Sequence, residues 1–95
     1  MTNSTYDSIV STPAHVAGKS AFAILDGLQN LHHSQQVVGA SYMLLLLCKK
    51  HQLDPAEVMQ ATARMLNDGV RDNNIHTRAI YSYLRMEVPN DNHLF

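Results

Sequence analysis

The amino-acid sequence predicts an all-α protein, and three observations support that prediction. Tyr42 to Cys48 is a run of seven apolar residues, which is typical of a helix that is covered on all sides. Asp54-Pro55-Ala56-Glu57 then combines a favoured N-cap, a proline at the first helical position and a capping-box acid. Elsewhere apolar residues recur at helical spacing, and no segment alternates as a strand does. We therefore expect a compact bundle of about four helices.

Length and composition indicate a single domain with little charged surface. The chain has 95 residues and a net charge of −1, and only 16% of its residues are charged, against roughly 25% in ordinary globular chains. So few charges favour self-association, and dedicated nucleic-acid binders are usually more basic. We expect a flexible tail, or a tail with a short docked piece, over residues 1–12, a helical domain over 13–89 and a second tail over 90–95.

The first predicted helix begins at Thr12-Pro13, because proline fits the first turn of a helix. Gly18 and Gly27 each weaken this helix by about 1 kcal/mol relative to alanine, so its well-formed part is expected between Lys19 and His32. Its apolar residues at helical spacing are Ala17, Ala21, Ile24, Leu25, Leu28 and Leu31.

The second predicted helix runs from about Gln35 to His51, with Ser34 as its N-cap. It is apolar on two opposite sides and should therefore be the central helix, covered by the other helices or by a second subunit. One side contains Val38, Ser41, Tyr42, Leu45 and Cys48, and the other contains Met43, Leu46 and Leu47. Because C₂ pairing is the commonest form of self-association, we predict a homodimer that uses this helix or the first one. On this helix the seam is formed by Met43, Leu46 and Leu47.

Two further helices are expected in the second half of the chain. The third begins after the Asp54 cap and stops at Gly69, a favourable C-terminal residue. The fourth begins after an Asn73 or Asn74 cap and reaches about Val88, just before a proline. The predicted core stripes are Val58, Ala61, Thr62, Met65 and Leu66 in the third helix, and Thr77, Ile80, Tyr81, Leu84 and Val88 in the fourth.

The pattern of reactive residues favours a non-enzymatic protein without a metal or cofactor. None of the six histidines is spaced i, i+4 from another, the spacing that places two metal ligands on one helical face. Cys48 lies inside the apolar run, which favours a buried and unreactive thiol in a reducing compartment. No phosphate-binding glycine loop or nucleophile motif occurs. We expect a cytoplasmic protein, since no apolar run approaches the roughly 20 residues that span a membrane.

A DNA-binding function is the alternative hypothesis. The segment from Leu45 to Leu66 resembles a helix-turn-helix motif, with Gln52 at the turn position where that family usually has glycine. The resemblance implies that Gln60 and Arg64 contact base edges. It also implies that Lys49 and Lys50 contact phosphates. Any two helices joined by a tight, capped turn would give the same pattern.

Residues outside the core stripe of the fourth helix predict a binding surface for another protein. Arg78 and Arg85 share one helical face, which suits an anionic partner, although arginines beside a core are also common without any function. Tyr83 and Met86 also fall outside the stripe, and both residue types are enriched in interfaces. Scattered exposed apolar residues are, however, ordinary in monomers.

Three segments together resemble small all-helical accessory proteins of bacteriophages. They are Val38–Leu47, Leu53–Val58 and the stretch from His76 to Leu84. The resemblance implies a protein that binds a host protein and redirects or inhibits it. The leading hypothesis is therefore a homodimer that modulates a partner protein.

Overall fold

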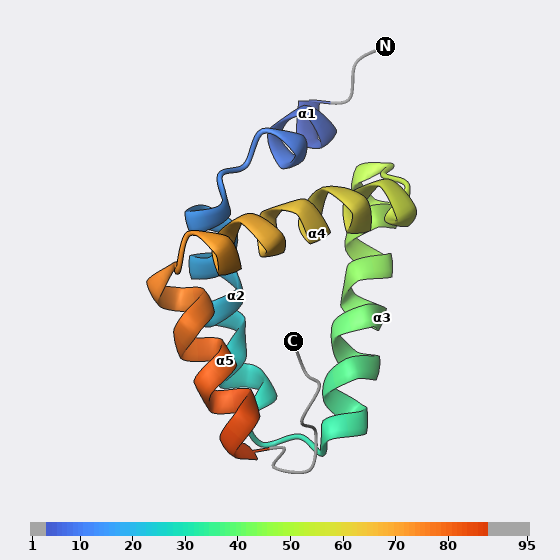
Figure 1. Cartoon of the computed structure of the whole chain (residues 1–95). Coiled ribbons are helices and arrows are strands. Elements are labelled where there is room, and N and C mark those ends of the chain that lie inside the picture. Colours follow the sequence, from blue (N-terminus) through green and yellow to red (C-terminus); the bar gives the residue numbers. More distant parts are fainter. Residues whose placement is uncertain (1–3, 88–95) are drawn as a thin grey trace.

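The computed structural model describes residues 4–87 and confirms an all-α fold, with no strand in that range. Within it the chain forms five helices, one more than the sequence predicted (Figure 1). They are α1 (Ser4–Val10), α2 (Ala14–Leu28), α3 (His33–His51), α4 (Pro55–Arg71) and α5 (Ile75–Glu87). The predicted end of the last helix at Val88 and the predicted tail over 90–95 lie outside the described residues.

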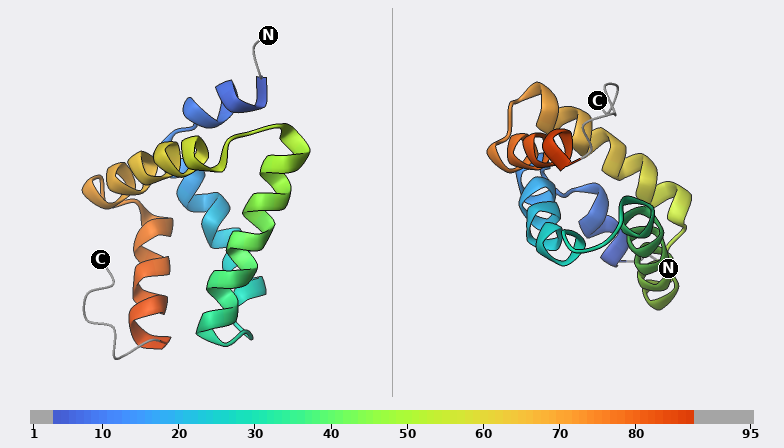
Figure 2. Two further views of the ribbon diagram at one scale, coloured as in Figure 1. Left: turned by 90° about the vertical axis from the view of Figure 1, so that its right-hand side faces the viewer. Right: turned by 90° about the horizontal axis from the view of Figure 1, so that it is seen from below.

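The core lies in a cluster of three helices, α2, α4 and α5. Helices α2 and α5 run side by side, and α4 crosses them at one end (Figures 1 and 2). The buried residues of this cluster are Gly18, Leu25, Val58, Ala61, Met65, Gly69 and Thr77. The predicted stripe of α4 is thus buried at three positions, whereas Thr62 and Leu66 remain exposed.

Two glycines allow the three helices of this cluster to approach closely. A Cβ atom built at Gly18 would lie 2.6 Å from Asn74 Oδ1 and 2.9 Å from Thr77 Oγ1. A Cβ atom at Gly69 would lie 3.0 Å from the same Thr77 oxygen. Gly18 therefore lies at a helix crossing. Helix α2 begins at Ala14, as Thr12-Pro13 predicted, so the segment before Lys19 is also helical; the helix ends at Leu28, before the predicted His32.

The prediction that the helix over residues 35–51 is central is wrong. Of its residues, α3 buries only Cys48, and α4 is the helix that it contacts most. Figure 1 shows α3 standing at the opposite end of α4 from α2 and α5, with a space between them. Hydropathy indicates that α3 requires a cover, but it does not specify which part of the chain, or of another chain, provides that cover.

The helix boundaries depend on caps that were predicted only in part. Asp54 caps α4 as expected, since its Oδ1 accepts a hydrogen bond of 2.9 Å from the Ala56 N–H. Asn74 caps α5, and its Oδ1 accepts from the N–H groups of His76 (3.1 Å) and Thr77 (3.0 Å). For α3 the N-cap is His32 rather than Ser34, because His32 Nδ1 accepts from the Ser34 N–H at 3.3 Å.

The C-terminal end of α4 differs from the prediction, whereas the N-terminal segment of the chain agrees with one of its two predicted alternatives. Gly69 does not stop α4, which continues to Arg71, and the left-handed residue that follows is Asn73, with φ of 58°. Near the N-terminus, where the sequence predicted a flexible tail or a tail with a short docked piece, α1 forms and packs against α4, in agreement with the second alternative. Tyr6 and Ile9 are the half-buried apolar side chains of α1.

Candidate protein-interaction surfaces

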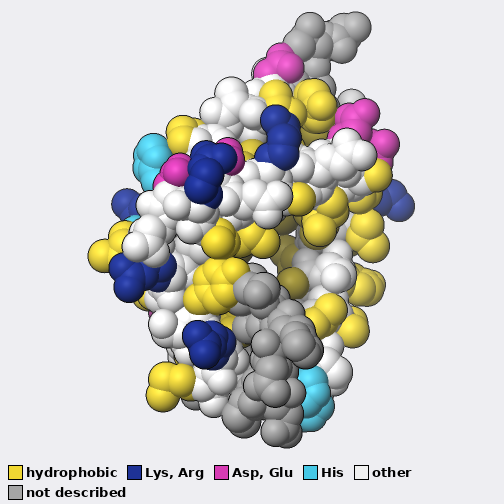
Figure 3. All heavy atoms as spheres, in the orientation of Figure 1, with side chains coloured by type: hydrophobic (Ala, Val, Ile, Leu, Met, Phe, Trp, Pro, Cys, Tyr) yellow, Lys and Arg dark blue, Asp and Glu magenta, His cyan; other side chains and the backbone are white. Residues whose placement is uncertain are grey.

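The most prominent surface of the described residues is the exposed apolar part of α3. Its seven large apolar side chains are between 49% and 67% exposed. We call the following set the α3 surface: Val37, Val38, Tyr42, Met43, Leu45, Leu46 and Leu47. Figure 3 shows apolar side chains along α3. Contiguous apolar patches of this kind mark sites of association.

The exposed apolar side chains of α3 lie on two sides of the helix, and the buried Cys48 marks another side. Cys48 is 2% exposed, so it marks the one side of α3 that the chain buries. The predicted seam of Met43, Leu46 and Leu47 lies on one free side. At 100° per residue, Val38, Tyr42 and Leu45 form another free side of the same helix.

A groove between α2, α4 and α5 is the second candidate surface, and the sequence did not predict it. It has a volume of about 250 Å³, and none of its lining residues is charged. Ala17 and Ala21 of α2, Met65 and Leu66 of α4, and Ile80 and Tyr81 of α5 are among them. The small residues of α2 were the available signal, since their size leaves space between the flanking helices.

The cationic face of α5 brings together part of the predicted partner-binding set. Arg78 and Arg85 are exposed and line one shallow cleft of about 210 Å³. Met86 is exposed and lies beside Arg85. Tyr83 does not belong to this face, because it is half-buried and lines a different cavity, together with His32 and other residues of the α2–α3 connection.

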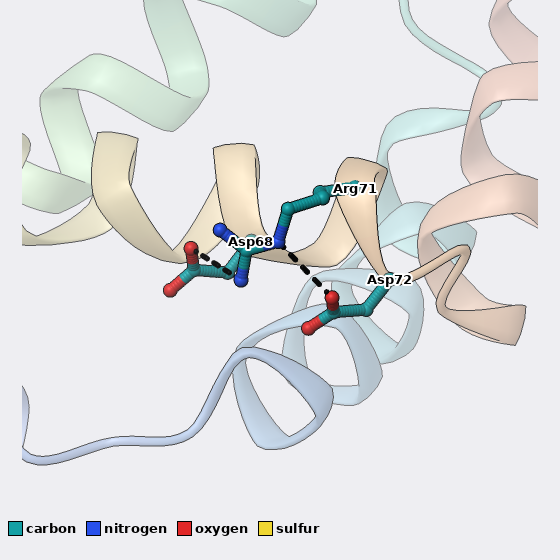
Figure 4. Close-up of polar contacts among 3 residues, drawn as sticks. All are labelled: Asp68, Arg71 and Asp72. Carbon is teal, nitrogen blue, oxygen red and sulfur yellow. Dashed lines mark hydrogen bonds and ion pairs between the residues drawn. The ribbon is translucent and has the colours of Figure 1, made fainter.

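Arg71 does not extend this cationic face, because its charge is balanced at the end of α4. Its guanidinium lies 3.1 Å from Asp68 Oδ1 and 3.2 Å from Asp72 Oδ1 (Figure 4). The hydrogen bond to Asp72, together with the negative charges of Asp72 and Asp68, raises the pKa of Arg71 above its usual value. The group is exposed, so these pairs define local geometry more than stability.

The residues of the DNA-binding hypothesis lie in the last turn of α3, in the turn that follows it and in α4. Gln52 adopts the left-handed conformation, with φ of 57° and ψ of 48°, at the position where a helix-turn-helix usually has glycine. Lys49, Lys50, Gln60 and Arg64 are all exposed. Glu57 is also exposed on α4 and would repel a phosphate backbone.

No cluster suited to a metal was found among residues 4–87. His32 and His33 lie together, with ring centroids 4.1 Å apart, but no group of three histidine, cysteine or acidic residues occurs within the described part of the chain. Cys48, the single cysteine, is a buried free thiol.

The fold and these surfaces define a class: an all-α protein of five helices in its described residues, with an apolar helix outside its core. No helix among residues 4–87 has both the length and the hydropathy needed to cross a membrane. Comparison of the chain with protein families, with curated proteins and with solved structures finds no match.

Proposed function

We propose that this protein is a non-enzymatic protein–protein interaction module that acts as a homodimer and modulates a second protein. The observation that supports this proposal best is the α3 surface, seven large apolar side chains that the described chain leaves about half exposed or more. Exposed apolar area is costly in water, at about 25 cal/mol per Å². A helix that carries the chain's longest apolar run, Tyr42 to Cys48, and buries only Cys48 of it is therefore suited to association.

Self-association would cover the α3 surface without a different protein. A second copy is the natural cover, because C₂ pairing is the commonest form of closed assembly.

The cationic face of α5 is the proposed site for the second protein. Arg78 and Arg85 carry charges in an otherwise charge-poor chain, and they line one cleft. Arginine is enriched in interfaces and binds carboxylates in a bidentate manner. We propose an acidic surface of another protein as the ligand. By its resemblance to bacteriophage accessory proteins, the chain would find this partner in a host cell and inhibit or redirect it.

A single charge on α3 tests the homodimer. Leu46→Glu should convert the protein to a monomer or prevent folding, because the seam would then bury an unpaired carboxylate. Gln60→Glu, a charge at an exposed position of α4, is the matched control and should remain dimeric. Sedimentation across micromolar concentrations measures both. A well-folded wild-type monomer throughout this range would refute the homodimer.

Charge reversal on α5 tests the second surface. Arg78→Glu with Arg85→Glu should leave the dimer intact and abolish capture of the partner from native cells. Met86→Ala, at a neighbouring exposed position, should weaken capture much less than the double reversal. If the double variant recovers the same protein in the same amount, the cationic face is not the binding site.

DNA binding is a second candidate, favoured by the left-handed Gln52 at the turn between α3 and α4. In that case Lys49, Lys50, Gln60 and Arg64 would contact the duplex, and binding would weaken steeply with salt. Recovery of a partner that is lost after nuclease treatment would favour this function. Gln60→Ala with Arg64→Ala should then abolish binding, whereas reversal of the α5 arginines should not.

A further inference from the structure

We infer that the homodimer is a mutual clasp, in which α3 of each copy lies in the α2–α4–α5 groove of the other. This inference rests on the proposed homodimer and specifies how its two chains fit. It assigns the groove a ligand, the apolar helix of a second copy of this chain. The site is therefore complete only when both copies are present.

A seam between two α3 helices cannot by itself cover the α3 surface. Met43, Leu46 and Leu47 occupy one free side, and a two-fold axis passing there would pair that side with itself. The other side, with Val38, Tyr42 and Leu45, would remain in water. Since a helix that is apolar on several sides is stable only when each is covered, a second apolar surface must meet it.

The groove has the chemistry required of that second surface. Its lining is mostly apolar, and neither it nor the segment from Gly27 to Cys48 contains Asp, Glu, Lys or Arg. Apolar side chains such as Val38 and Leu45 would therefore enter it without burying an unpaired charge. The exposed Leu66 and the alanines of α2 leave space for large side chains from another chain.

The same chain's own α3 is held away from the groove at both ends. At its start, Gln36 Nε2 donates a hydrogen bond of 2.8 Å to the carbonyl oxygen of Leu28 in α2. At its end, Cys48 is buried and α3 contacts α4. Short connections precede and follow the helix, at residues 29–32 and 52–54. These constraints favour a second copy as the occupant of the groove.

Cross-linking between two differently tagged chains tests the clasp. One chain carries Ala21→Cys in the groove, and the other carries Val38→Cys or Tyr42→Cys on α3. The native Cys48 stays in both, because it is buried. After mixing and refolding, a short thiol-to-thiol cross-linker should join the two tags. Ala63→Cys, on the exposed side of α4, replaces Ala21→Cys in the control and should give at least tenfold less product.

The outcomes separate the clasp from the proposed homodimer itself. A dimer in sedimentation that cross-links through α3 alone, for example with Leu46→Cys in both chains, and never to Ala21→Cys would overturn the clasp and leave the homodimer standing. A single chain carrying both Ala21→Cys and Tyr42→Cys that cross-links within itself would show that the chain fills its own groove. A monomer at every concentration would refute both proposals.

A variant of the groove gives an independent measurement. Ala21→Arg places a bulky charge at a position that is exposed in the isolated chain, so each copy should still fold. It should raise the dimer dissociation constant at least tenfold, whereas Ala63→Arg should leave that constant within twofold. Equal dimer affinity for the two variants, with both folded by circular dichroism, would overturn the clasp.

Discussion

The three-helix cluster and α3 differ in how much of their apolar side-chain surface the chain itself buries. The cluster of α2, α4 and α5 contains Leu25, Val58, Ala61 and Met65 as buried apolar residues, spread among polar positions. Helix α3 carries the longest apolar run of the sequence, Tyr42 to Cys48, and buries only Cys48. The length of an apolar run therefore does not indicate where the core of the single chain lies. In this chain it indicates instead the surface that is available to another chain.

The difference follows from how closely each region can approach its neighbours. In the cluster, Gly18 and Gly69 bring backbones together around Thr77, so that few large side chains suffice to exclude water. Helix α3 has large side chains, but of its residues only Cys48 is buried, and α3 contacts α4 less than α2 does. A Cβ atom added at Gly39 of α3 would have no neighbour within 4 Å, in contrast to one at Gly18.

The largest effect should come from removing a buried side chain of the cluster. Leu25→Ala should lower the free energy of unfolding by about 2–5 kcal/mol, because it leaves a cavity in the core. Its neighbour Ile24 is 61% exposed, against 8% for Leu25, so Ile24→Ala should change stability by less than about 0.5 kcal/mol. Urea denaturation measures both. Equal losses for the two variants would mean that α2 packs with a different face inward.

A second, smaller effect should distinguish two glycines of the same helix. Gly18→Ala should destabilise the fold by about 1–3 kcal/mol, because the new methyl group overpacks the contact with Thr77 and displaces the Asn74 cap. Gly27 has open space around it, so Gly27→Ala should stabilise by up to about 1 kcal/mol. Thermal unfolding of the two variants should therefore shift in opposite directions. A stabilising Gly18→Ala would show that α2 and α5 lie further apart.

Local sequence signals predicted the fold class and several helix ends. The Asp54 cap, the Asn74 cap and the four longer helices were all recognisable, because caps and periodicity depend on residues close together in the chain. Gly69 shows the limit of such signals. Because glycine is favourable at the C-terminal end of a helix, Gly69 predicted that the helix ends there. In the structure, the absence of a side chain at Gly69 instead makes room for Thr77 of α5.

The candidate surfaces were predictable only where one helix forms them. Met43, Leu46 and Leu47 are exposed, as a seam requires, and Arg78 and Arg85 share a face, because helical spacing alone decides both. The groove requires three helices to come together, and no local pattern describes that. A short docked piece was one alternative for the N-terminal segment, but its helical form and its contact with α4 were not predicted, since its apolar residues are few and α4 lies far along the chain.

The smallest predicted effect concerns the turn that joins α3 to the cluster. Gln52 has φ of 57° and ψ of 48°, a conformation that costs a residue with a Cβ roughly 1–2 kcal/mol. Gln52→Gly should remove that strain, and the greater freedom of glycine in the unfolded chain offsets part of the gain. We expect a net stabilisation of about 0.5–1 kcal/mol.

Asn73 provides the matched control for this turn, within the cluster itself. It has φ of 58°, but asparagine tolerates the left-handed region better than glutamine does. Asn73→Gly should therefore gain less than Gln52→Gly in the same urea titration. Because glycine keeps the direction of the turn, neither variant should change the dimer dissociation constant. A loss of dimer affinity confined to Gln52→Gly would show that the Gln52 side chain, and not only its backbone, sets how α3 is presented to the second copy.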